Sequence, residues 1–181
     1  KNRLRAIALN DQRTESNPDE VNVYYKGADS SFELYLFVIG INEYKNSTYN
    51  LNYAQSDATS FKEMIEKNAS AIYSNINTVF IQNEQATKSN ILQQLQKIIK
   101  EAEPQDVFMF YYAGHGVMNE GTMGYEKDFY LVPHDVTKLY GADEQLAEKA
   151  VSSQTLNEIA QQIPARKQLF LLDACQSGAA V

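Results

Sequence analysis

Short apolar runs recur along the chain after Glu33, and they are the first feature that predicts structure. The clearest run, residues 34–41, is apolar almost without interruption. A strand that is covered on both faces has this pattern, whereas a strand with one solvated face alternates apolar and polar positions. We therefore predict strands at residues 34–41, 76–81, 107–112, 129–132 and 169–172.

Segments with helical spacing separate these strands. Residues 57–66 place apolar side chains three and four positions apart, which puts them on one face of a helix. A second amphipathic segment follows Thr87, a residue suited to capping, and ends before Pro104. A third is expected to begin at Ser153 or Thr155. Apolar strands that alternate with helices predict an α/β fold with a mostly parallel sheet and helices on both faces.

The first part of the chain does not share this pattern. Residues 10–20 are polar and have neither a helical nor a strand period, although residues 21–25 are compatible with a short extended piece. We predict a linker or N-terminal arm over residues 1–31 and a single domain over residues 32–181.

Composition and charge exclude several classes of function. The net charge of the chain is −7 and its 16 lysines and arginines are scattered, which argues against nucleic acid as a partner. The apolar runs are far shorter than the roughly 20 residues of a membrane span. One cysteine and two histidines allow neither an internal disulfide nor a conventional zinc site, so no structural metal is expected. The chain begins at Lys1 without a secretion signal, which suggests a fragment or processed product. The compartment is therefore unknown, with the cytoplasm favoured.

Two places beyond predicted strand ends carry reactive side chains. His115 follows the strand at 107–112 and lies between Gly114 and Gly116, which leaves room to present an imidazole beside free N–H groups. A tight turn with an incidental histidine is the competing interpretation. Cys175 follows the strand at 169–172, where a thiolate could attack a carbonyl. A lone cysteine is more often a small buried apolar side chain.

Considered together, the two places favour chemistry. Catalytic groups in parallel sheets collect beyond the carboxyl ends of strands, and neighbouring strands bring such ends within side-chain reach. We therefore expect Cys175 and His115 to form a nucleophile and base pair.

The same residues carry a family resemblance. The stretches Tyr-Tyr-Ala-Gly-His-Gly at 111–116 and Leu-Leu-Asp-Ala-Cys-Gln-Ser-Gly at 171–178 resemble the two catalytic motifs of the caspase and metacaspase superfamily of cysteine peptidases. Residues 37–44 resemble the first strand of that family, and residues 51–58 resemble another metacaspase stretch. The resemblance covers residues 34–178 and implies a caspase-like three-layer sandwich.

The resemblance also implies catalytic roles. Cys175 would be the nucleophile of an endopeptidase that works through an acyl-enzyme, and His115 would be the general base and acid. The main-chain N–H groups of Gly116 and Cys175 would form the oxyanion hole. No third member of a triad is evident in the sequence.

Substrate specificity is expected to rest on acidic residues. Asp173 stands where metacaspases carry Asp, and a carboxylate there would pair with Arg or Lys before the scissile bond. Asp57 would be a second carboxylate of the same pocket, although a helix N-cap is its alternative role. Ala113 would lie in the pocket floor, where the family often has Ser, and Gln176 replaces a common His. We predict cleavage after basic residues of protein or peptide substrates.

The resemblance raises further expectations about activation. The chemistry requires no cofactor, but calcium activation occurs among metacaspases, and Asp128 and Asp135 lie where family acids bind it. Their spacing lacks a self-contained calcium-loop pattern. Self-processing of a zymogen would use Lys127, Lys138 or Lys149.

A missing piece of the sheet is also expected. The family has a further segment, the small subunit, that would cover the apolar edge left by the last strand, and an upstream or downstream regulatory domain is conceivable. A catalytically silent caspase-like scaffold is the main alternative function, and the clostripain-like branch of the same clan is another. A nucleotide-binding domain is disfavoured, because no glycine-rich phosphate loop follows a strand.

Overall fold

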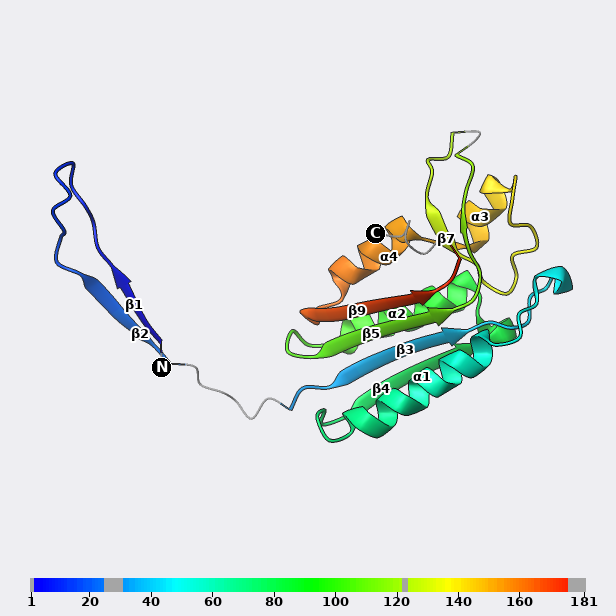
Figure 1. Ribbon diagram of the computed structural model, residues 1–181, viewed down its shortest axis with the longest axis horizontal. Helices are drawn as coiled ribbons and strands as arrows, with labels where there is room; N and C mark the ends of the chain where they lie inside the picture. The colour runs from blue at the N-terminus through cyan, green and yellow to red at the C-terminus, as the bar shows by residue number, and fades with distance from the viewer. Residues whose placement is uncertain (1, 25–30, 122–123, 176–181) are drawn as a thin grey trace. The chain divides into compact units, whose positions relative to one another are not determined.

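The computed structural model describes residues 2–24, 31–121 and 124–175 (Figure 1). The chain divides into two compact units, residues 1–30 and 31–181. The larger unit contains all the candidate functional residues.

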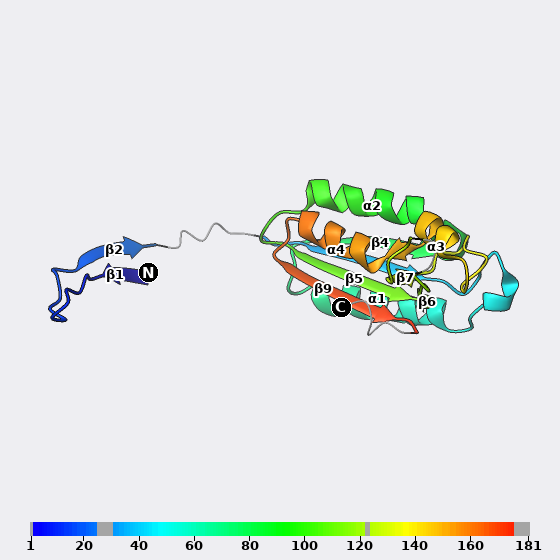
Figure 2. The ribbon, with the colours of Figure 1, turned by 90° about the horizontal axis from the view of Figure 1, so that it is seen from above.

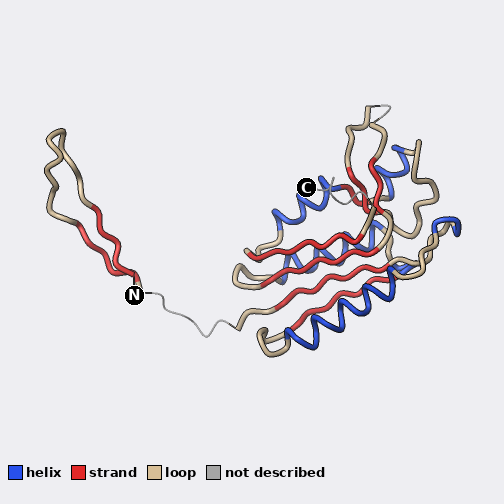
Figure 3. Tube along the Cα trace, viewed as in Figure 1, coloured by secondary structure: helices blue, strands red, loops and turns tan. Residues whose placement is uncertain are grey.

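A parallel sheet forms the centre of the larger unit (Figure 3). Its described strands are β3 (Leu34–Gly40), β4 (Ile76–Gln82), β5 (Val107–Ala113) and β9 (Lys167–Asp173), in the order β4-β3-β5-β9. The register places Gly40, Ala113 and Asp173 at one level across three strands. The carboxyl ends of these strands therefore meet along a single edge of the sheet.

Helices cover both faces of this sheet (Figure 2). On one face, α1 (Ala54–Ala69) packs against alternate side chains of β3 through Ala58 and Phe61. On the other face lie α2 (Lys88–Glu101) and α4 (Ser153–Gln162), whose apolar side chains contact the aromatic residues of β3 and β5. These three layers confirm the predicted α/β class. No helix among the described residues is long and apolar enough to cross a membrane.

The predicted helices begin at or within a few residues of the expected positions. Thr87 caps α2, and its side chain accepts a hydrogen bond from the Asn90 N–H. Helix α4 begins at Ser153, the first of the two predicted starts, and Ser152 caps it. Asp57 does not cap α1, because the helix begins three residues earlier and its N-cap is Tyr53. Asp57 instead lies in the first turn, and its N-cap alternative was wrong.

A second, smaller sheet corrects the interpretation of residues 116–152. Strands β6 (Gly116–Met118), β7 (Phe129–Leu131) and β8 (Val151–Ser152) pair antiparallel, so the strand predicted near 129–132 is not part of the parallel sheet. The apolar run is fully buried in the antiparallel sheet, and a strand of the parallel sheet would be buried as well. Its apolar pattern therefore does not show to which of the two sheets it belongs. The segment before residue 149, for which no helix was predicted, contains α3 (Asp143–Lys149), whose buried Leu146 anchors it.

Two single-turn 3-10 helices complete the larger unit. The first, η1 (Ser47–Tyr49), lies between β3 and α1, and the second, η2 (Asn83–Gln85), lies between β4 and α2. Both follow the carboxyl ends of strands, at the edge of the sheet that carries the candidate catalytic residues.

The N-terminal unit, where a linker or N-terminal arm was predicted, contains a hairpin. Strands β1 (Asn2–Ala6) and β2 (Asp19–Val23) pair antiparallel, and Glu20 contacts Arg3 and Arg5 across the pair. Its described side chains are exposed throughout. The pairing joins residues some 13–21 positions apart, as the registered partners Ala6 with Asp19 and Asn2 with Val23 show, and a local period does not detect such pairing.

Gly40 gives a test of how closely α1 approaches the sheet. A Cβ at this position would lie 2.6 Å from the Ala58 Cβ and 3.0 Å from the Ala54 carbonyl oxygen. We expect Gly40→Ala to lower the free energy of unfolding by about 1–3 kcal/mol, because helix backbone has to shift to admit the methyl group. Urea denaturation measures this free energy of unfolding, and the exposed Ser60→Ala is the control. An unchanged midpoint for Gly40→Ala would contradict this packing.

Candidate active site

A pocket of about 530 Å³ opens at the carboxyl edge of the parallel sheet. It brings together residues that are far apart in the sequence and come from three different segments. The first is the β3–α1 loop with the start of α1, the second follows β5, and the third follows β9. Its lining consists of Asn50, Leu51, Asn52, Tyr53, Ala54, Asp57, Ala113, Gly114, His115, Asp173, Ala174 and Cys175.

This lining contains the predicted base, nucleophile, both predicted acidic residues and Ala113. Ala113 is the last residue of β5, is buried, and is level with Asp173 on β9. Gly116, the remaining predicted residue, does not line the pocket but lies against the Cys175 main chain. Gln176 and the residues after it in the cysteine motif lie outside the described residues.

The His115 imidazole is oriented by a main-chain carbonyl. Its Nε2 lies 2.8 Å from the carbonyl oxygen of Tyr49. A carbonyl only accepts hydrogen bonds, so Nε2 carries the proton and Nδ1 of the neutral ring keeps its lone pair. The rings of Tyr44 and Tyr49 flank the imidazole, with centroids 5.0 and 6.2 Å from it. The contact therefore fixes the tautomer of the ring and leaves Nδ1 as the nitrogen that can accept a proton.

Tyr49 is the functional group that the sequence did not reveal. It supplies an orienting acceptor where no third triad member was evident, and it does so through its main chain. Any residue type has a carbonyl, so no side-chain pattern could have identified it. Only the conformation of the β3–α1 loop determines which carbonyl reaches His115.

Asparagine side chains fix that loop. The Asn83 Oδ1 accepts hydrogen bonds from the N–H groups of Asn42 and Glu43, at 2.9 and 3.2 Å. The Asn42 Oδ1 in turn accepts from the Gln55 N–H at the start of α1, at 2.9 Å. Asn50 accepts from the Tyr44 N–H at 2.8 Å. These bonds satisfy main-chain N–H groups just beyond β3, and they tie the loop to η2 and to the start of α1.

Cys175 lies two residues beyond β9, is exposed and has a free thiol. Gly116 packs directly behind it, since a Cβ on Gly116 would lie 2.7 Å from the Cys175 carbonyl oxygen and 2.6 Å from the Phe129 ring. The Val132 N–H donates to the His115 carbonyl, which makes Gly116 and Leu131 a non-hydrogen-bonded pair. The Gly116 N–H therefore points away from β7.

The acidic residues share one neighbour. Asp57 projects from the first turn of α1 and Asp173 ends β9, and both are exposed. The Tyr111 hydroxyl donates to the Asp173 Oδ2 at 3.4 Å, and its ring stacks on Phe61 with centroids 4.2 Å apart. Burial, and then the charges of Asp173 and Asp57, raise the pKa of Tyr111 to about 12. The ion pairs of the described residues involve neither aspartate, so the pocket presents uncompensated negative charge.

The two acids expected to bind calcium differ in their surroundings, since the buried Asp135 Oδ1 has no hydrogen-bond partner among the described residues. Asp128 uses its carboxylate at the start of α4, where it accepts hydrogen bonds from the Ser153 hydroxyl and the Phe129 and Gln154 N–H groups. Within the described part of the chain, no three His, Cys, Asp or Glu side chains gather as metal ligands. The other histidine, His134, contacts the Glu43 carbonyl through its Nδ1, at 2.6 Å. We derive no catalytic step through a metal.

Comparison with known proteins decides the family. The sequence model of the caspase domain matches residues 35–180 of this chain. The chain belongs to the caspase-domain family. The resemblance expected from the His115 and Cys175 motifs is thereby confirmed, and the match spans both motifs.

Relatives of this caspase domain are named as proteases. Metacaspase-1 of Plasmodium falciparum is 27% identical over 182 residues, which cover 90% of this chain and 28% of the relative. A probable protease from a Desulfuromonadales bacterium is 27% identical over 154 residues, covering 77% of this chain and 18% of that protein. Metacaspase-1 of Scheffersomyces stipitis is 34% identical over 96 residues, covering 52% and 23%. This chain thus spans less than a third of the length of these relatives.

A solved structure shares the fold of the caspase domain. The crystal structure of a protein from Geobacter sulfurreducens matches with a TM-score of 0.60 at 16% identity, over 80% of this chain and 50% of that one. At this identity the likeness supports the fold alone. It agrees with the three-layer arrangement described above.

Reactivity of the thiol tests the pairing of Cys175 with His115. Cys175 is the only cysteine of the chain, so alkylation by iodoacetamide reports on it alone. We expect His115→Ala to slow alkylation near neutral pH by about tenfold or more, because the imidazole no longer accepts the thiol proton. His134→Ala, at the only other histidine, is the matched control. Equal rates for the two variants would contradict the pairing.

Proposed function

We propose that this domain is the catalytic part of a cysteine endopeptidase that cleaves peptide bonds after arginine or lysine. One observation carries the proposal: a single pocket holds Cys175, an oriented His115 and two aspartates without ion-pair partners among the described residues. The family match supports the cysteine-peptidase class. The acidic lining supports the choice of substrate.

The chemistry follows from the groups present. His115 Nδ1 accepts the proton of the Cys175 thiol, and the sulfur attacks the carbonyl carbon of the scissile bond. The oxygen becomes an oxyanion that accepts hydrogen bonds from the N–H groups of Gly116 and Cys175. The C–N bond then breaks, and His115 donates its proton to the leaving amine. Water, deprotonated by His115, releases the second product from the thioester and restores the thiol.

Specificity for basic residues follows from charge. A guanidinium or ammonium group entering the pocket meets the carboxylates of Asp173 and Asp57, and charge-assisted hydrogen bonds of this kind are worth about 1.5–3 kcal/mol each. An aspartate side chain entering the same pocket would be repelled. The Tyr111 hydroxyl, protonated at any working pH, holds Asp173 at the pocket wall.

Paired fluorogenic peptides with Arg, Lys or Asp before the scissile bond test this proposal. We expect turnover of the basic peptides alone, and none with Cys175→Ala. Asp173→Asn should lower kcat/KM for the arginine peptide by about ten- to hundredfold, as the loss of one charged partner predicts. Asp11→Asn in the exposed hairpin is the matched control. Efficient cleavage after Asp would overturn the assignment of the pocket.

The alternative function is a catalytically silent scaffold. It would be favoured if no peptide were cleaved and a thiol-directed peptide inhibitor failed to label Cys175. Parallel assays with and without calcium also test the activation expected from the family. Self-processing, if it occurs, fits Lys127 or Lys138 better than Lys149, because the first two are exposed in loops and Lys149 ends helix α3.

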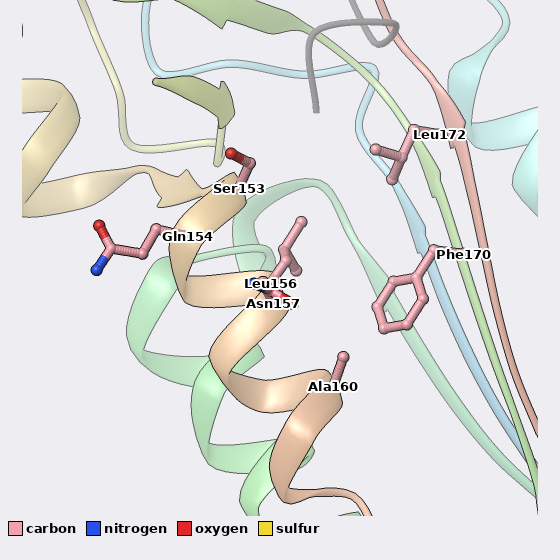
Figure 4. A pocket seen from close by; sticks show the side chains of 7 residues that line it. All are labelled: Ser153, Gln154, Leu156, Asn157, Ala160, Phe170 and Leu172. Carbon is pink, nitrogen blue, oxygen red and sulfur yellow. The ribbon is translucent and has the colours of Figure 1, made fainter. Parts of the chain in front are cut away.

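We also propose that a further segment of the same peptidase, its small subunit, completes the sheet at β9. Within the described residues β9 pairs only with β5, and Leu169 on it is 42% exposed. A groove of about 560 Å³ lies between β9 and α4, into which Phe170 and Leu172 point (Figure 4). The chain spans under a third of its curated relatives, which leaves ample sequence for such a segment. The remaining lining comes from α4: Ser153, Gln154, Leu156, Asn157 and Ala160.

Hydrogen exchange of the intact peptidase tests this completion. We expect the outward main-chain N–H groups of β9 to be protected, because an added strand would bind them. Ala160→Arg fills the groove and should speed their exchange at least tenfold, whereas Gln161→Arg, exposed and outside the groove, should not. Rapid exchange in the unaltered protein would contradict the proposal.

A further inference from the structure

Two buried tyrosine hydroxyls lie against the main chain of His115. The Tyr44 hydroxyl accepts a hydrogen bond from the His115 N–H at 2.9 Å. The Tyr112 hydroxyl donates to the His115 carbonyl at 2.8 Å and lies 3.0 Å from the Val132 carbonyl. Tyr44 is 4% exposed and Tyr112 is fully buried. Both polar groups of the His115 main chain are therefore held by side chains that solvent does not reach.

Gly114 makes this arrangement possible. A Cβ at that position would lie 2.7 Å from the Tyr112 hydroxyl oxygen and 2.9 Å from that of Tyr44. The main chain before His115 thus passes directly over both hydroxyls, at a distance that only glycine allows. The glycine before the histidine serves a close approach of the backbone, and its φ angle is not in the left-handed region.

The hydroxyls act as neutral hydrogen-bonding groups. Burial raises the pKa of Tyr44 to about 12, and burial together with the neighbouring Tyr44 hydroxyl raises the pKa of Tyr112 further above its usual range. Neither tyrosine ionises at a working pH, which excludes them as proton donors or acceptors for the reaction. Their contribution is geometric.

Tyr44 also belongs to the loop that orients the imidazole. The β3–α1 loop supplies the Tyr44 hydroxyl to the His115 main chain and the Tyr49 carbonyl to its Nε2. The Tyr44 ring additionally flanks the imidazole, at 5.0 Å between centroids. A shift of Tyr44 would therefore move the backbone and the ring of His115 relative to Cys175.

We propose that Tyr44 and Tyr112 are positioning residues for the reaction, which fix the His115 main chain so that Nδ1 faces the Cys175 thiol. The inference rests on the proposed function, because it assigns these residues to the base of that reaction. Removing the Tyr44 hydroxyl leaves the His115 N–H without its partner, and removing the Tyr112 hydroxyl takes away one of the two donors to the His115 carbonyl, which keeps the Val132 N–H. The imidazole then samples orientations in which proton transfer from Cys175 is slower.

Tyr44→Phe and Tyr112→Phe test the proposal, with Tyr35→Phe as the control. Tyr35 is similarly buried, at 6% exposure, but lies near the start of β3, at the opposite end of the strand from the pocket. We expect Tyr44→Phe to lower kcat for the arginine peptide about tenfold with KM changed less than twofold, and to slow alkylation of Cys175 to a similar extent. Tyr35→Phe should change neither rate.

A double-variant comparison separates positioning from a general loss of structure. In His115→Ala the main-chain hydrogen bond to Tyr44 is retained and the imidazole is absent, so adding Tyr44→Phe should not slow alkylation further. An equal slowing in both backgrounds would overturn the proposal. So would an alkylation rate in the unaltered chain that His115→Ala does not change. Alkylation does not require turnover. Failure of peptide cleavage alone would therefore reject the proposed function, and the alkylation rates would still decide whether Tyr44 positions His115.

Discussion

The shared register of β3, β5 and β9 is the constraint on which the rest of this domain depends. Because the three strands run parallel and in step, Gly40, Ala113 and Asp173 end at one level. The loop after each strand therefore begins at the same edge, and side chains as far apart in the sequence as Asn50 and Cys175 meet in one pocket. A register slip of one residue would turn every side chain of a strand to the opposite face.

Much of the site could be predicted from the sequence, because the placement of its residues depends only on this register. Apolar runs located the strands, and the parallel α/β arrangement that they imply brings His115 and Cys175 to one edge. The structure places Asp57 and Asp173 in the same pocket, as the family resemblance implied. The features that were missed depend instead on tertiary pairing. The antiparallel strand β7 and the N-terminal hairpin are examples, because pairing partners are not encoded in local periodicity.

The main chain accounts for the other omissions. The acceptor that orients His115 is a carbonyl, which leaves no trace in the residue type of Tyr49. The conformation of its loop is set by asparagine side chains that bind main-chain N–H groups, and such bonds are specified only when the chain is folded. The two glycines beside His115 are main-chain features that the sequence did indicate in part. Gly114 and Gly116 were recognised as unusual, and the structure shows that close contacts require both.

The nucleophile follows β9, the outer strand of the described sheet, so its position depends on the unpaired side of that strand. Within the described residues Cys175 follows a strand that has a neighbour on one side only, so its position is fixed by β5 and by the contact with Gly116. The base His115, in contrast, follows the central strand β5, and the Tyr44 hydroxyl, the Tyr112 hydroxyl and the Tyr49 carbonyl all hold it by hydrogen bonds. A group that is rigidly held needs no further support, whereas one at an edge responds to whatever pairs with that edge. Pairing at β9 would therefore act on the nucleophile and leave the base unchanged.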